Sequence, residues 1–114
     1  MQLEKTVLKT IKMTDFTALV TICKDGSPHL VAGWNCLPLG PDTLLMAGER
    51  YIITRQNLER DARFWLLVAS RELNNGFRLS GRAEFSDKPA DVELIKRYWP
   101  RCSFALRLTV EKVE

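Results

Sequence analysis

The segment Gly48–Arg63, with the sequence GERYIITRQNLERDAR, contains the residues of this chain whose types and spacing suggest chemistry. It follows an apolar run, passes a glycine and two charged residues, and enters a stretch with helical spacing. The helical face expected there comprises Ile53, Gln56, Asn57 and Arg60. A strand-to-helix junction of this kind presents free backbone N–H groups and the positive end of a helix dipole. An anion such as a phosphate group fits such a junction.

Three side chains near the expected helix start could add to this anion site. Thr54 offers a hydroxyl donor, and Arg50 and Arg55 offer positive charges. The same residues also have a simpler interpretation. A threonine at a helix start is usually only a cap, and arginines on a helix usually face solvent. The sequence of this segment alone leaves both interpretations open.

The segment Pro28–Asn35, with the sequence PHLVAGWN, is a second candidate site. The small residues Ala32 and Gly33 directly precede Trp34 in what reads as a strand. Glycine weakens a strand unless a ligand or another backbone must come close. The position therefore indicates either a β-bulge or a flat ligand that lies against the main chain.

The cysteines and the histidine do not form a recognisable reactive group. Cys23, Cys36 and Cys102 are an odd number without CxxC spacing, and His29 is the only histidine. This pattern favours neither a disulfide framework nor a zinc site. We expect no bound metal, no catalytic cysteine or histidine, and no redox pair between Cys36 and Cys102.

Length and composition place the chain among ordinary globular proteins. Its 114 residues, 46% hydrophobic and 27% charged, predict one domain over residues 1–114. The net charge of +3 comes from scattered basic residues, which gives no argument for nucleic acid. No apolar run is long enough to span a bilayer, and the charged N-terminal segment does not resemble a signal peptide. We therefore expect a cytoplasmic protein.

Alternating apolar residues predict an antiparallel barrel with short helices. The six expected strands are Phe16–Cys23, Pro28–Asn35, Thr43–Ala47, Arg63–Ser70, Phe77–Ser86 and Phe104–Glu111. Helical spacing over Leu3–Ile11 predicts an amphipathic helix that covers the fold without joining its core. A third helix is expected after Asp87 as its cap and before Pro100. The expected fold class is mainly β.

The strand Arg63–Ser70 is apolar on both faces. With Phe64, Leu66 and Val68 facing the interior, Trp65 and Leu67 point outward. Together with Tyr98 and Trp99, which we expect beside them, they would form an apolar patch unusual for a monomer. Either a second subunit or the chain's own helices must cover it.

The order of these motifs resembles a known family. A DGSPHLVAGWN hairpin, a glycine-containing loop, a TRQNLERDAR helix and a following apolar strand are similar to the FMN-binding split-barrel proteins, the superfamily of pyridoxamine phosphate oxidase. Within it, the chain is most similar to the small FMN-binding protein of sulfate-reducing bacteria. The resemblance covers Phe16 to Val113. It implies a six-stranded antiparallel split barrel of the FMN-binding type.

The resemblance also implies a homodimer with one FMN per subunit at the subunit boundary. The strand beside the flavin ring would be Val31, Ala32, Gly33, Trp34 and Asn35, and the partner would contribute Trp99. The phosphate segment would comprise Gly48, Glu49, Arg50, Tyr51, Ile53 and Thr54. Ile53 stands where the small FMN-binding proteins have a lysine, so Arg50 or Arg55 must supply the charge.

The function implied is that of a small flavoprotein of the redox or electron-transfer type, or a flavin-dependent oxidoreductase. An oxidase acting on pyridoxamine phosphate is one alternative, although the chain shows no second basic cluster for a substrate phosphate. A nucleic-acid-binding barrel of the OB type is another, with Trp34, Trp65 and Phe77 as stacking platforms. The electron donor and acceptor are not implied.

Overall fold

The structure is a computed structural model that describes residues 1–14, 16–34, 36–48 and 51–114. Its helices are α1 (Lys5–Met13), α2 (Ile52–Arg60) and α3 (Pro89–Lys96). Its strands are β1 (Phe16–Ile22), β2 (Pro28–Trp34), β3 (Leu37–Pro38), β4 (Thr43–Ala47), β5 (Arg63–Ser70), β6 (Asn75–Ser86) and β7 (Ala105–Val113). No helix in these ranges is long and apolar enough to cross a membrane.

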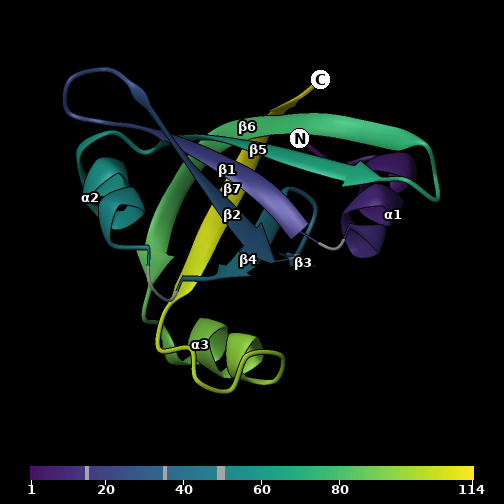
Figure 1. Ribbon diagram of the computed structural model, residues 1–114. Coiled ribbons are helices and arrows are strands. Elements are labelled where there is room, and N and C mark those ends of the chain that lie inside the picture. Colours follow the sequence, from purple (N-terminus) through teal and green to yellow (C-terminus); the bar gives the residue numbers. More distant parts are fainter. Residues whose placement is uncertain (15, 35, 49–50) are drawn as a thin grey trace.

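The described strands form one antiparallel sheet that curls into a half-barrel (Figure 1). The strand order is β2-β1-β5-β6-β7-β4-β3, so β2 and β3 are the edges of the sheet. The mainly β fold class is confirmed, with seven strands instead of six. The additional strand, β3, has two residues that pair with β4, which is too short to give an alternating pattern.

The turn of the predicted DGSPHLVAGWN hairpin joins β1 to β2 as expected, whereas the turn before β6 covers residues 71–74, ahead of the expected turn at Asn74–Gly76. In the β1–β2 hairpin, Gly26 has a φ of 88°, and the Asp25 carboxylate accepts bonds from the backbone N–H and hydroxyl of Ser27. Before β6, Asn74 has a φ of 53°. Glycine and asparagine tolerate this left-handed region, which such turns require. The bounds of β4 and β5 match the predicted strands residue for residue.

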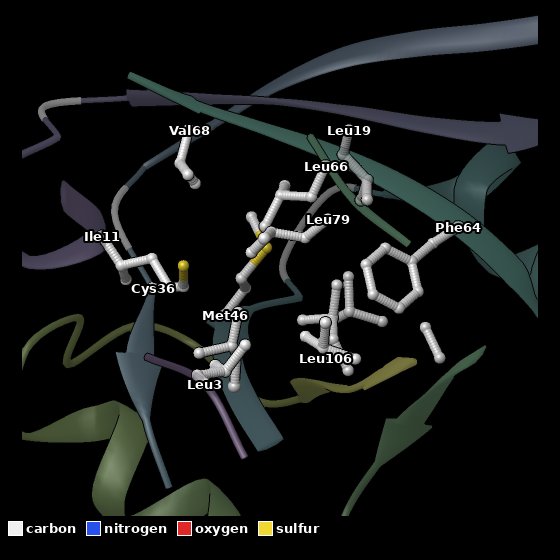
Figure 2. Close-up of a cluster of buried hydrophobic side chains, with 14 of the residues drawn as sticks. Leu3, Ile11, Leu19, Cys36, Met46, Phe64, Leu66, Val68, Leu79 and Leu106 are labelled. Carbon is white, nitrogen blue, oxygen red and sulfur yellow. The ribbon is translucent and has the colours of Figure 1, made fainter. Parts of the chain in front are cut away.

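A large apolar cluster fills the concave side of the sheet (Figure 2). Phe64, Leu66 and Val68 of β5 are fully buried in it, as predicted. The expectation that the first helix stays outside the core is wrong. Val7 and Ile11 of α1 are buried in the same cluster, so this helix closes one end of the interior.

Helix α2 is attached to β1 by polar side chains. The Asn57 side-chain amide donates to the Thr21 hydroxyl at 3.0 Å, and Arg60 Nη2 donates to the carbonyl of Ile22 at 2.9 Å. Asn57 and Thr21 are both buried. The helix expected from the spacing of Ile53, Gln56, Asn57 and Arg60 is confirmed. Of these four only Asn57 is buried, together with Thr54 and Leu58.

Helix α3 packs against β4 and β7 through a second, smaller apolar cluster around Leu45 and Ile95. The expected cap at Asp87 is wrong, because Lys88 is the N-cap and makes no side-chain cap bond. Instead, the Ser86 hydroxyl donates to Asp91 at 2.7 Å, and Arg107 pairs with the same carboxylate at 3.1 Å. These contacts fix α3 at the end of the sheet.

Two glycines of β6 give a matched test of how closely β6 and β7 approach each other. A Cβ at Gly81 would overlap the carbonyl oxygen of Thr109 on β7, whereas a Cβ at Gly76 would lie 3.6 Å from the nearest atom, the carbonyl oxygen of Val68. We expect Gly81→Ala to destabilise the fold by about 3 kcal/mol. Gly76→Ala should stay within about 0.5 kcal/mol of wild type. Urea unfolding of both variants measures the difference, and equal stabilities would contradict the β6–β7 register.

Candidate functional site

The junction between β4 and α2 is built on two aromatic residues from other strands and loops. The backbone N–H of Gly48 donates to the carbonyl of Phe104 at 2.9 Å. A Cβ at Gly48 would lie only 2.9 Å from Phe85 Cε1 and 3.2 Å from the Phe104 carbonyl oxygen. Glycine is needed here because the chain passes directly against these groups. The predicted site residues Glu49 and Arg50 lie outside the described residues.

Among the described residues, no side chain caps the N-terminus of α2. Tyr51 is the N-cap residue, and the first helical hydrogen bond runs from the N–H of Arg55 to the Tyr51 carbonyl at 2.9 Å. No acidic residue lies in the first turn. The N–H groups of residues 52 to 54 therefore lack an intrahelical acceptor, and the positive end of the helix dipole is not neutralised by its own first turn.

Thr54 lies in this first turn and is not a cap. Its side chain is 1% exposed, and its hydroxyl oxygen has no hydrogen-bond partner in the part of the chain that the structure describes. A buried hydroxyl without a partner is unfavourable and calls for an explanation. This hydroxyl lies beside the start of α2, where it could donate a hydrogen bond to a ligand group.

Arg55, the next residue, is held against the same two aromatic rings. Its guanidinium carbon lies 4.8 Å from the Phe104 ring centroid and 5.5 Å from that of Phe85. Its Nε donates to Glu59 one helical turn later, at 3.3 Å. The simple interpretation of Arg55 as a freely solvated side chain is therefore wrong. The sequence did not indicate Phe85 or Phe104 as site residues, because both occupy ordinary alternating positions.

Close packing explains why a glycine occupies position 33 of β2, which the sequence did not reveal. A Cβ there would lie 2.6 Å from Met46 Cε and 2.8 Å from both Thr17 Oγ1 and the Tyr51 hydroxyl oxygen. The β1–β2 register is continuous from Phe16–Trp34 to Ile22–Pro28, so the expected bulge is wrong. The alternative of a flat ligand against this strand stays a prediction.

Tyr51 brings the two candidate segments together. Its hydroxyl donates to the carbonyl of Ala32 at 3.0 Å, which links the start of α2 to β2 across 19 positions of sequence. Partial burial raises the pKa of the Tyr51 phenol, so the hydroxyl keeps its proton at neutral pH. The predicted ring-binding strand and the predicted phosphate segment thus lie side by side.

The remaining predicted site residues are placed as follows. Val31 packs against the main core, and Ala32 is exposed. Asn35 and the Trp34 side chain lie outside what the structure describes. Ile53 is exposed on α2, and Trp99 packs into the cluster under α3. Within one chain, α3 packs on β4 and β7, so the expected position of Trp99 beside Trp65 of β5 is wrong.

Two of the cysteines are buried in separate clusters. Cys36 lies in the main core, where burial raises the pKa of its thiol to about 12. Cys102 lies in the cluster under α3, and its thiol donates to the Phe104 carbonyl at 2.8 Å. The expectation that they do not act as a redox pair stays a prediction. In the described ranges, no three His, Cys, Asp or Glu side chains are grouped to hold a metal.

Comparison with known proteins identifies the fold. No model of a protein family matches the sequence, and no curated protein matches it. Several solved structures do match this chain. HupZ from Group A Streptococcus has a TM-score of 0.84 at 19% identity, with 97% of this chain and 91% of that chain covered. A protein of the pyridoxinephosphate oxidase family from Clostridium acetobutylicum has a TM-score of 0.75 at 16% identity, over 93% and 82% of the two chains.

An F420 reductase matches over 98% of both chains, with a TM-score of 0.79 at 13% identity. The chain has the fold of the pyridoxinephosphate oxidase family. At identities of 13% to 19%, these three matches establish the fold alone. The closer resemblance to the small FMN-binding proteins stays a prediction.

The unpartnered hydroxyl of Thr54 leads to a prediction about the stability of the ligand-free protein. Valine has nearly the same shape as threonine and removes the buried polar atom. We expect Thr54→Val to stabilise the ligand-free protein by about 1 kcal/mol, because an unsatisfied hydroxyl no longer has to be buried. Urea unfolding of the ligand-free protein measures this. A loss of stability would mean that the hydroxyl has a protein partner in solution.

Proposed function

We propose that this protein is a small flavoprotein that binds FMN at the junction of β2, β4 and α2 and takes part in electron transfer or flavin-dependent oxidoreduction. One observation carries the proposal: a buried hydroxyl without a partner, that of Thr54, lies in the uncapped first turn of a helix. A phosphate group provides the acceptor and the negative charge that such a site favours. The shared fold is consistent with this proposal.

The residues at the junction fit the two ends of a phosphorylated flavin. The N–H groups at the start of α2 and the Thr54 hydroxyl would hold the phosphate. The adjoining segment of β2, around Ala32 and Gly33, would lie beside the ring, because the bond from Tyr51 to the Ala32 carbonyl joins it to the helix start. The exposed side chains of Ile52 and Ile53 add apolar surface at the same point.

The flavin supplies the electron-accepting chemistry when it is bound, so the chain needs no acid or base of its own for that step. The task of the described residues is to bind and orient. Tyr51 stays protonated and serves as a fixed donor to the main chain. For this reason we assign no catalytic residue.

The nucleic-acid alternative loses support from the structure. Phe77, one of its three expected stacking platforms, packs against the main core. Trp65 is half-buried, and the guanidinium carbon of Arg63 already lies 5.7 Å from its ring centroid. The Phe77 ring and one face of the Trp65 ring therefore already contact protein groups. Stacking on bases is the interaction that this alternative requires.

We further propose that a second copy of the chain covers the convex face of β2, β1 and β5. In the sheet register, Val20 of β1 lies between Leu30 and Trp65, and Ala18 lies between Ala32 and Leu67. These two rows are apolar and point outward. Leu30 is 65% exposed and Leu67 52% exposed. The buried face of helix α1 belongs to the core on the concave side. Its last residue, Met13, lines a pocket with Ala18 and Leu67 without burying Leu67.

The first test is the identity of any chromophore that copurifies with the protein. We expect a yellow protein that releases FMN on denaturation, identified by its visible spectrum and mass. If the protein is purified without chromophore, titration with FMN should quench flavin fluorescence and raise the melting temperature. Failure to bind FMN, riboflavin or a deazaflavin would contradict the proposal.

The dimer is tested at Leu67, which is 52% exposed in the row that it forms with Ala18 and Ala32. We expect Leu67→Glu to dissociate the subunits, because it places an unpaired charge in an apolar interface. Thr6→Glu, on the exposed face of α1, serves as a matched control and should leave the dimer intact. Sedimentation velocity reports the mass. A wild-type monomer that still binds FMN would refute a site shared between subunits.

A further inference from the structure

We propose that Arg55 supplies the positive charge for the FMN phosphate, and that Glu59 competes with the phosphate for that charge. This inference rests on the proposed FMN binding. Arg55 would then be the residue through which the protein selects a phosphorylated flavin over riboflavin.

The position of Arg55 follows from the two aromatic residues at the junction. The edge of the Phe85 ring lies against Gly48, and the Arg55 guanidinium lies over the same ring. Phe104 accepts the N–H of Gly48 with its carbonyl, and its ring also lies under Arg55. The same two residues therefore hold both the loop glycine and the cation, which places the charge beside the uncapped start of α2.

The guanidinium is pre-organised and still has donors to offer. Contact with two ring faces restrains the side chain, which lowers the entropy that binding must remove. Its Nε donates to Glu59, and its two terminal nitrogens have no hydrogen-bond partner among the described residues. The side chain is 45% exposed, so a ligand can reach it. Two parallel N–H groups are what a phosphate binds in the bidentate manner.

The other described basic residues of this segment already bind other protein groups. Arg60 donates to the Ile22 carbonyl and to Asn57 Oδ1. Arg63 pairs with Asp61 at 2.7 Å, a contact that holds the pKa of that carboxyl down at about 2. Residue 53 is an isoleucine and carries no charge. Within the described part of this segment, Arg55 is the cation whose two terminal nitrogens both lack a hydrogen-bond partner.

Glu59 is a weak partner that a phosphate can displace. The Arg55–Glu59 contact is a single bond of 3.3 Å between two exposed side chains one helical turn apart. Such pairs contribute little in water. A phosphate carries more negative charge than one carboxylate and accepts two bonds at once. Removing the carboxylate should therefore make Arg55 a better phosphate ligand.

The test compares FMN with riboflavin in variants of opposite expected sign. We expect Arg55→Gln to weaken FMN binding roughly tenfold and to leave riboflavin binding unchanged. Arg55→Lys should lose less, because it keeps the charge. Glu59→Gln should tighten FMN binding about twofold without affecting riboflavin. Lys9→Gln removes one charge from the exposed face of α1, at the opposite side of the sheet in Figure 1, and should change neither affinity.

Fluorescence titration at low ionic strength gives the affinities, and urea unfolding checks that each variant is folded. Equal FMN affinity in wild type and Arg55→Gln would overturn the inference while leaving the flavoprotein proposal intact. Equal losses for FMN and riboflavin would also overturn it, since Arg55 would then act only through the fold. A wild-type protein that binds no flavin would instead overturn the proposed function itself.

Discussion

The buried hydrogen bond from Asn57 to the Thr21 hydroxyl is the contact on which the candidate site depends. It fixes α2 against β1, and Arg60 reinforces it at the Ile22 carbonyl. Because α2 is fixed there, its first turn lies beside the end of β4 and next to β2. Two buried polar groups that satisfy one another also specify a single position of the helix, since any shift would leave both unpaired. The resemblance motif TRQNLERDAR therefore includes residues that hold the fold.

The candidate site consists of a closely packed, hydrogen-bonded surround and one central hydroxyl that lacks a hydrogen-bond partner among the described residues. Around it, Gly33 and Gly48 allow side chains and carbonyls to approach within van der Waals contact, and Tyr51 ties β2 to the helix. At its centre, the Thr54 hydroxyl has no partner within the described ranges. Proteins keep such imperfect groups where a ligand uses them. A rigid surround with one unmet hydrogen bond is the arrangement expected of a pre-formed binding site.

The sequence predicted the parts of this fold that depend on local alternation. The bounds of β4 and β5 and the position of the β1–β2 turn follow from period-two patterns and turn residues. The two-residue strand β3 was missed because it has no period of its own. The burial of Asn57 in α2 could not be predicted, because the residue is polar and its burial depends on a partner 36 positions away. The contributions of Phe85 and Phe104 to the site are likewise visible only in three dimensions.

The central claim is that the first turn of α2 binds a phosphate. Two-dimensional amide NMR of the labelled protein tests it directly, with FMN and riboflavin added in turn. The account predicts that the amide signals of residues 52 to 54 shift strongly with FMN and little with riboflavin, while those of β2 near Ala32 shift with both. If FMN binds and the amides of the first turn of α2 do not move, the phosphate lies elsewhere and the account is contradicted.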